Sequence, residues 1–195
     1  MRKIYPFFIA LMILIGCVYI IIPIIKYDKT QEREMQSKLI ESEQYLSQKY
    51  SCHMKLLNYS LKDSFVANYC LAENPDIKFS VKWWVNHNEF NDDFLQQCLT
   101  DELKKDISKK LSEIGVVEFN VHIGTMTGPP RDLTKRLFKY YQKYRRPPKI
   151  SEINTAENFM YITVEAQNEY KDLIYYALSD MNLPTKKLDI KPFSH

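Results

Sequence analysis

One uncharged stretch near the N-terminus constrains this chain more than any other feature. Residues 4–25 read IYPFFIALMILIGCVYIIIPII, which is 22 residues without a charged side chain between Arg2-Lys3 and Lys26. At 1.5 Å per residue a helix of this length extends about 33 Å, enough to cross a hydrocarbon core of about 30 Å. The stretch predicts a membrane-spanning helix, so that the rest of the chain is held beside a bilayer.

Two other interpretations of this stretch stay open. A cleaved signal peptide has a similar start, but its apolar run is normally about 7–15 residues and ends at a site of small residues. Here the run is longer and no such site follows. A lipoprotein signal is the second alternative, because Leu14-Ile15-Gly16-Cys17 has the form of a lipobox with Cys17 as the acylated residue. The residues after Cys17 stay apolar, however, and this favours an uncleaved transmembrane anchor.

The anchor divides the chain into four parts. The predicted order is a cytoplasmic tail (1–3), a transmembrane helix (4–25), a juxtamembrane helix (26–50) and an α+β domain (51–195), either as one unit or as two sub-units (51–115 and 116–195). Cations flank both ends of the apolar stretch, so the flanks alone do not fix its orientation. Long domains cross membranes largely regardless of charge. We therefore expect a cell-membrane protein with its C-terminal domain outside.

Composition indicates a folded domain and excludes several classes of function. Apolar residues make up 45% of the chain, which is too many for a disordered protein. Only four glycines are present, and no GxGxxG or GxxxxGK motif for a phosphate-binding loop occurs. The net charge of +3 gives no chain-wide field that would select nucleic acid, which argues against that partner.

Hydrophobic periodicity predicts the elements of the domain. Alternating patterns predict strands at 53–61, 64–71, 77–85, 116–123, 158–166 and 188–192, and 3.6-residue patterns predict helices at 30–50, 132–144 and 168–181. A further long helix is expected between an N-cap at Asn91 or Asp92 and a stop at Gly115. The first three strands predict an antiparallel meander, and the later alternation of strands and helices permits a parallel pair. The predicted fold class is α+β, with a mixed, mainly antiparallel sheet packed against helices after the transmembrane helix.

No stretch of the chain carries a catalytic or cofactor motif. GxSxG, HExxH and DxDxDG patterns do not occur. Cys52 and His53 are neighbours, but neighbours on a strand point to opposite faces. None of Cys52, Cys70 and Cys98 belongs to a CxxC pair, and helix capping explains the acidic residues that follow His87. The sequence therefore assigns no catalytic, cofactor-binding or metal-binding residue, and it does not favour an enzyme.

The one local charge anomaly is the segment 131–149, RDLTKRLFKYYQKYRRPPK. Its basic residues are Arg131, Lys135, Arg136, Lys139, Lys143, Arg145, Arg146 and Lys149. With Asp132 as the single acid, the segment has a local net charge of +7. Such a segment is typical of surfaces that bind anionic lipid or an anionic cell-wall polymer. The alternative is a solvated helix face that only keeps the protein soluble, with the following side chains packed inward: Leu133, Leu137, Tyr141 and Tyr144.

Trp84 is a second candidate contact. In the run 77–85 the apolar residues alternate with polar ones, and Trp84 falls on the polar side. Aromatic side chains are enriched at the centres of protein interfaces. Trp84 is therefore a candidate partner contact, and partial cover by a neighbouring loop is the alternative.

The first part of the chain resembles small, mostly uncharacterised membrane-anchored proteins and lipoproteins of Gram-positive bacteria. The resemblance rests on a short basic start, an apolar segment, the helix end Tyr45-Leu46-Ser47-Gln48-Lys49-Tyr50 and the strand that follows at His53. It covers roughly the first 85 residues. It implies a cell-surface location and no known activity, so no functional residue follows from it. The three cysteines after the anchor depart from this group, whose exported members tend to be cysteine-poor.

These observations predict a single-pass membrane protein with a non-catalytic extracytoplasmic α+β domain. The expected partner is a protein or an anionic component of the envelope, and no cofactor is expected. Two alternatives stay open. One is an exported enzyme that acts on envelope material through a dispersed site, and the other is an inward-facing domain whose basic helix binds lipid or nucleic acid.

Overall fold

The computed structural model of the chain describes residues 29–193, apart from gaps at 63, 126–130, 154–159, 182 and 184. The predicted anchor, residues 4–25, lies outside the described residues. Within them, no helix combines the length and the apolar character needed to cross a bilayer.

The strands form two sheets. The first sheet is antiparallel, in the spatial order β1 (Met54–Leu61), β2 (Phe65–Leu71), β3 (Asn74–Trp84) and β4 (Glu89–Asp92). The second sheet contains β5 (Phe119–Thr125), β6 (Met160–Ala166) and β7 (Thr185–Lys191), with β5 antiparallel and β7 parallel to β6. The predicted α+β fold with mostly antiparallel pairing and helical packing is confirmed. The prediction of one sheet is wrong, because β5 pairs with β6 and not with the first meander.

Helices cover one side of each sheet. The first helix covers residues 29–49, and the later helices are α2 (Phe94–Glu113), α3 (Arg131–Tyr144) and α4 (Lys171–Ser179). Short 3₁₀ turns lie at Ile150–Glu152 and Asn168–Tyr170. The N-cap of α2 is Asp93, and not Asn91 or Asp92 as predicted, because Glu89–Asp92 forms the short edge strand β4.

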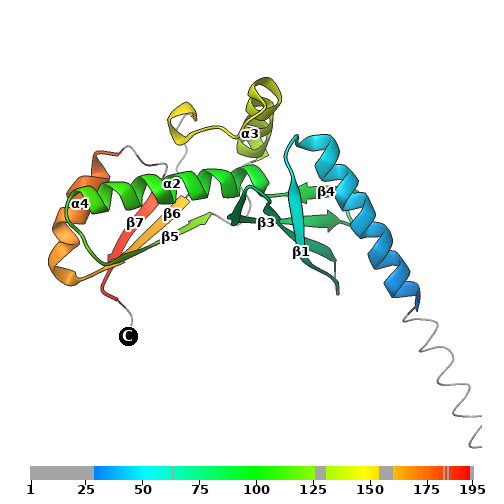
Figure 1. Cartoon of the computed structure of the whole chain (residues 1–195), viewed down its shortest axis with the longest axis horizontal. Helices are drawn as coiled ribbons and strands as arrows, with labels where there is room; N and C mark the ends of the chain where they lie inside the picture. The colour runs from blue at the N-terminus through cyan, green and yellow to red at the C-terminus, as the bar shows by residue number, and fades with distance from the viewer. Residues whose placement is uncertain are drawn as a thin grey trace, which may run out of the picture.

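Helix α2 is the element that both sheets share. Figure 1 shows it running across the two sheets, and its first turns pack on β3 while later turns pack on β5. Its buried apolar residues are Phe94, Leu95, Cys98, Leu99, Leu103, Ile107 and Leu111. They belong to one hydrophobic cluster that includes the inner faces of both sheets. The helix stops at Gly115, as predicted, where a φ of +84° places the chain in the left-handed region that glycine tolerates.

The residues that follow α2 differ from the prediction. A strand was predicted to begin at residue 116, with Val117 on its apolar face together with Phe119, Val121 and Ile123, but Val117 is 83% exposed. The strand begins only at Phe119. Val116 is buried instead, because its N–H donates to the carbonyl of Leu111 and closes the end of the helix.

A buried carboxylate holds the first helix on the first sheet. The side chain of Asp92 on β4 is 1% exposed. It accepts hydrogen bonds from three side chains of the first helix and the residue after it: Tyr45 Oη at 2.6 Å, Lys49 Nζ at 2.6 Å and Tyr50 Oη at 2.8 Å. Burial, and then the neighbouring carboxylate, raises the pKa of Tyr45 and Tyr50 well above the ordinary tyrosine range. Both phenols therefore stay protonated and donate to Asp92.

Replacing Asp92 with Ala is expected to lower the free energy of unfolding by roughly 3 kcal/mol, because it leaves the partly buried ammonium of Lys49 and the hydroxyls of Tyr45 and Tyr50 without their acceptor. Urea unfolding followed by tryptophan fluorescence measures this, since both tryptophans of the chain lie on β3. Glu113→Ala is the matched control. Glu113 pairs with the exposed Lys109 at 3.9 Å, and loss of such a pair costs less than about 1 kcal/mol. Equal losses in the two variants would contradict this account of Asp92.

Candidate functional site

Helix α3 packs on α2 by one face and leaves the other to solvent. Leu133, Leu137 and Tyr141 are buried, and their four-residue spacing places them on one side of the helix. The hydroxyl of Tyr141 also accepts the N–H of Ser51 at 2.8 Å, which ties α3 to the segment after the first helix. Figure 1 shows α3 standing above α2, on the side opposite the sheets.

The outer face of α3 carries most of the predicted cations. Lys135, Lys139 and Lys143 are exposed and recur every four residues, so they form one row along the helix. Arg136 and Arg145 are also exposed. The side chain of Arg131 lies outside the described part of the structure.

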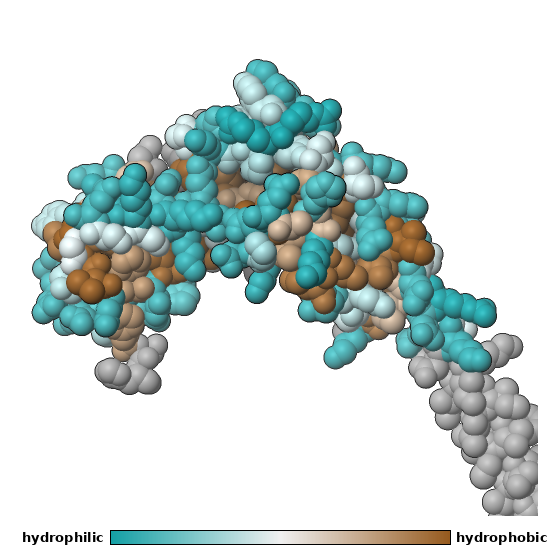
Figure 2. Space-filling model, viewed as in Figure 1, coloured by the Kyte–Doolittle hydropathy of each residue, from teal (hydrophilic) through white to brown (hydrophobic). Residues whose placement is uncertain are grey.

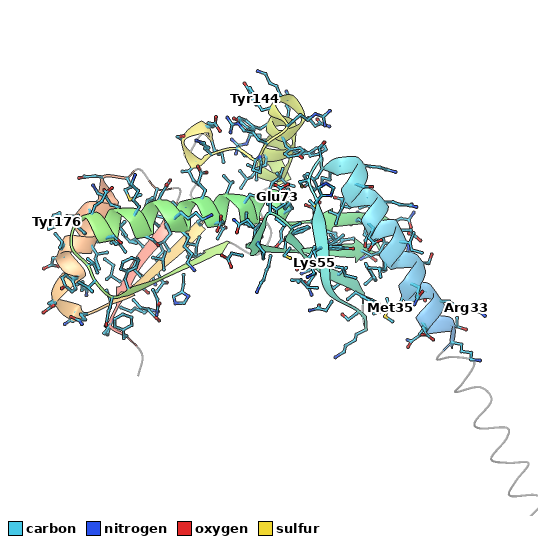
Figure 3. All side chains as sticks on the ribbon, in the orientation of Figure 1. Arg33, Met35, Lys55, Glu73, Tyr144 and Tyr176 are labelled. Atoms are coloured by element: carbon cyan, nitrogen blue, oxygen red, sulfur yellow. The ribbon has the colours of Figure 1, made fainter. Side chains whose placement is uncertain are left out.

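Two tyrosines lie among these cations. The rings of Tyr140 and Tyr144 are 4.4 Å apart, and the ammonium of Lys143 is 4.8 Å from the ring of Tyr144. Tyr144 was expected to pack inward, but it is 49% exposed, and Figure 3 shows it at the free end of α3. The inward prediction fails here because Tyr144 is the last residue of the helix and its ring packs against that of Tyr140 at a tilt of 38°.

The cations after the helix have structural roles. Both terminal nitrogens of Arg146 donate to Glu152, with Nη1–Oε2 at 2.8 Å, and the N–H of Lys149 donates to the same carboxylate at 2.8 Å. These donors hold the pKa of Glu152 well below its usual range. Arg145 has a φ of 55°, and its N–H donates to the carbonyl of Tyr141 at 2.8 Å, which closes the end of α3. A substitution at Arg146 therefore changes the local structure as well as the charge, whereas Arg145 closes the helix through its backbone N–H.

Trp84 lies apart from the basic face. It is opposite Glu89 on the outer side of the first sheet, as the alternation predicted, and is 45% exposed. The ring and cation–ring contacts of the described residues connect Trp84 only to His87, on its own hairpin, at 5.5 Å. The neighbouring Trp83 points inward and packs on Phe90 at 4.7 Å. The two candidate surfaces of the sequence analysis are thus separate.

The cysteines have the environment of structural residues. Burial raises the pKa of the Cys98 thiol to about 12 and that of Cys52 to about 11. Both are protonated at neutral pH and are poor nucleophiles. Cys70 is also buried.

Asp92 and Asp93, which follow His87, are both engaged in hydrogen bonds. Asp92 faces the first helix, and Asp93 accepts the N–H of Ser80 at 2.7 Å. No set of three or more metal-ligating side chains converges within the described ranges.

One surface was missed by the sequence analysis. A groove of about 760 Å³ lies between the polar face of α2, the edge of β5, and Asp76 and Ile77 of β3. Its helical side includes Asp101, Lys104 and Lys105, whose spacing in the sequence is indistinguishable from that of any solvated helix face. Only the strand order shows that this face lies beside an open sheet edge.

Comparison with known proteins finds no matching family model, no matching curated protein and no matching solved structure. The functional argument therefore depends on the residues themselves. Of the two candidate surfaces that the sequence indicated, the row of lysines on α3 indicates its ligand most directly, because exposed ammonium groups bind anions.

Proposed function

We propose that this chain is a single-pass membrane-anchored protein whose extracytoplasmic α+β domain binds an anionic polymer of the cell envelope, without catalysis. The uncharged stretch at residues 4–25 supports the anchor. The observation that carries the binding proposal is the row formed by Lys135, Lys139 and Lys143 on the outer face of α3.

The row fits a ligand with repeated negative charge. Residues four apart on a helix are separated by about 6 Å along its axis. After Asp132, α3 contains no carboxylate that would neutralise the three ammonium groups. A basic residue near an anionic surface contributes about 1 kcal/mol, so three of them support weak, salt-dependent binding. Weak binding is sufficient for a tethered domain, because the anchor already keeps the domain at a high local concentration near the envelope.

The position of α3 favours a polymer over the lipid headgroups of the anchoring membrane. The first helix, residues 29–49, is about 30 Å long at 1.5 Å per residue. Tyr50, at its C-terminal end, packs on Tyr141 of α3 with ring centroids 5.1 Å apart. The N-terminal end, which continues from the predicted anchor, points away from α3 in Figure 1. With that helix upright, α3 stands several Debye lengths of about 8 Å from the membrane surface.

The binding proposal is tested with inorganic polyphosphate as the probe and the full chain in detergent micelles at low salt. Reversing the row with Lys135→Glu, Lys139→Glu and Lys143→Glu is expected to weaken binding at least about tenfold, because three attractive charges become repulsive. The matched control is Lys55→Glu, Lys78→Glu and Lys82→Glu, on the outer side of the first sheet. Equal weakening in both triple variants, or none in the first, would contradict a role for α3.

The orientation of the domain relative to the membrane is tested by thiol labelling of intact cells, for which a cysteine is added at an exposed position. The natural thiols are poor probes because Cys70 and Cys98 are buried and the pKa of Cys52 is raised to about 11. Ser112 is exposed in the last turn of α2. Ser112→Cys is expected to react with a membrane-impermeant maleimide before lysis, whereas the unmodified chain reacts weakly. Labelling that appears only after lysis would place the domain inside.

A further inference from the structure

Three of the four sheet edges in the described strands are protected against pairing. Proteins blunt edge strands by making them short, by bulges and by lysines. The edge strand β4 has four residues. On β1 the register shifts at the bulge around Leu57, beside Lys55. On β7 the register shifts at its start, and the strand carries Lys187 and Lys191.

The remaining edge strand, β5, has none of these devices. Its sequence FNVHIGT contains no lysine and no proline. Its pairing with β6 is unbroken from Phe119 opposite Ala166 to Thr125 opposite Met160. An edge strand of seven residues presents a row of unpaired backbone N–H and C=O groups to whatever can lie beside it.

Space for another strand exists at this edge. The groove of about 760 Å³ is lined on one side by residues 121–123 of β5. Consecutive residues of a strand point to opposite faces, so a groove that contacts three in a row follows the edge of the strand. Its other walls are the polar face of α2 around Asp101, Lys104 and Lys105, and Asp76 and Ile77 near the start of β3. Figure 2 shows the molecule hollowed below the middle of α2, between the two sheets.

We propose that a second copy of this chain occupies this groove, with β5 paired antiparallel to β5 about a two-fold axis. Directly opposite residues in an antiparallel pair share a face. An axis at Val121 or at His122 therefore places odd-numbered residues opposite odd-numbered ones. Phe119, Val121 and Ile123 then all face the helices, while Asn120 and His122 face outward, and the two second sheets become one sheet of six strands.

The charges of α2 are self-complementary about the same axis. The two copies of α2 would lie antiparallel on one side of the continuous sheet. Asp101 is one helical turn from Lys104 and Lys105, so helices that cross between these positions set Asp101 of each copy against the lysines of the other. Lys104 has no ion-pair partner among the described residues, whereas Lys105 already contacts Asp101 at 2.7 Å. This charge pattern favours a second copy over an unrelated peptide.

A charge-swap experiment tests the helix pairing. The full chain is studied in detergent micelles by sedimentation velocity, and the unmodified protein is expected to form a concentration-dependent dimer. Asp101→Lys alone sets lysine against lysine, and Lys104→Glu with Lys105→Glu sets carboxylate against carboxylate. Each variant is expected to raise the dimer dissociation constant about tenfold, and an equimolar mixture of the two to restore it, because every contact is again attractive. A monomeric unmodified protein, or a mixture as weak as its components, would overturn the proposal.

A second pair of variants tests the strand edge. Asn120→Lys with His122→Lys adds charge on β5, and a lysine at 122 places an ammonium near Glu165, which lies 3.4 Å from His122. This variant is expected to weaken the dimer about tenfold. Tyr161→Lys with Thr163→Lys, on the same outer face of the central strand β6, is the control and is expected to leave the dimer unchanged. Equal effects would reject pairing through β5. None of these positions lies on α3, so this proposal and the polymer-binding proposal fail separately.

Discussion

The apolar stripe of α2 is the interaction on which the rest of this structure depends. Sheets of three or four strands need a second layer to bury their inner faces, and here one helix supplies it to both sheets. Leu99, Leu103, Ile107 and Leu111 are almost completely buried along its length. A helix of 20 residues extends about 30 Å, which exceeds what one small sheet covers. The polar face of α2 is left bare between the sheets and becomes one side of the groove.

Two attachments to this core decide where the candidate surfaces lie. Asp92, at the end of β4, accepts hydrogen bonds from three side chains at the C-terminal end of the first helix and at Tyr50, which fixes this helix on the core. Leu133, Leu137 and Tyr141 attach α3 on the opposite side of α2 from the sheets. The row of lysines therefore lies near the C-terminal end of the first helix, while the open edge of β5 lines the groove beside α2. Polymer binding and self-pairing use different faces and are compatible.

Local patterns predicted the elements of the fold better than their arrangement. The alternation of apolar and polar residues identified β1, β2, β3, β5 and β6 and the outward direction of Trp84. These features depend only on the residues next to them in the sequence. Strand β4 was missed because Phe90 is its only apolar residue, and the division into two sheets was missed because strand pairing is a long-range choice. On α3 the periodicity of Leu133, Leu137 and Tyr141 was sufficient to predict which side of the helix is buried. The pairing of Arg146 with Glu152, outside the basic segment, was not visible, nor was the open edge of β5, which exists only once strand order is known.

Native-state hydrogen exchange of backbone amides tests most directly whether α2 unites the two sheets in one core. Amides of Phe79 and Val81 on β3 and of Ile162 and Val164 on β6 should exchange through the same global opening. Leu103→Ala should lower the opening free energy at both pairs of sites equally, by roughly 2–5 kcal/mol, because the cavity it leaves lies in a shared core. Loss of protection in one sheet while the other keeps its full value would show two separate cores and would contradict this account.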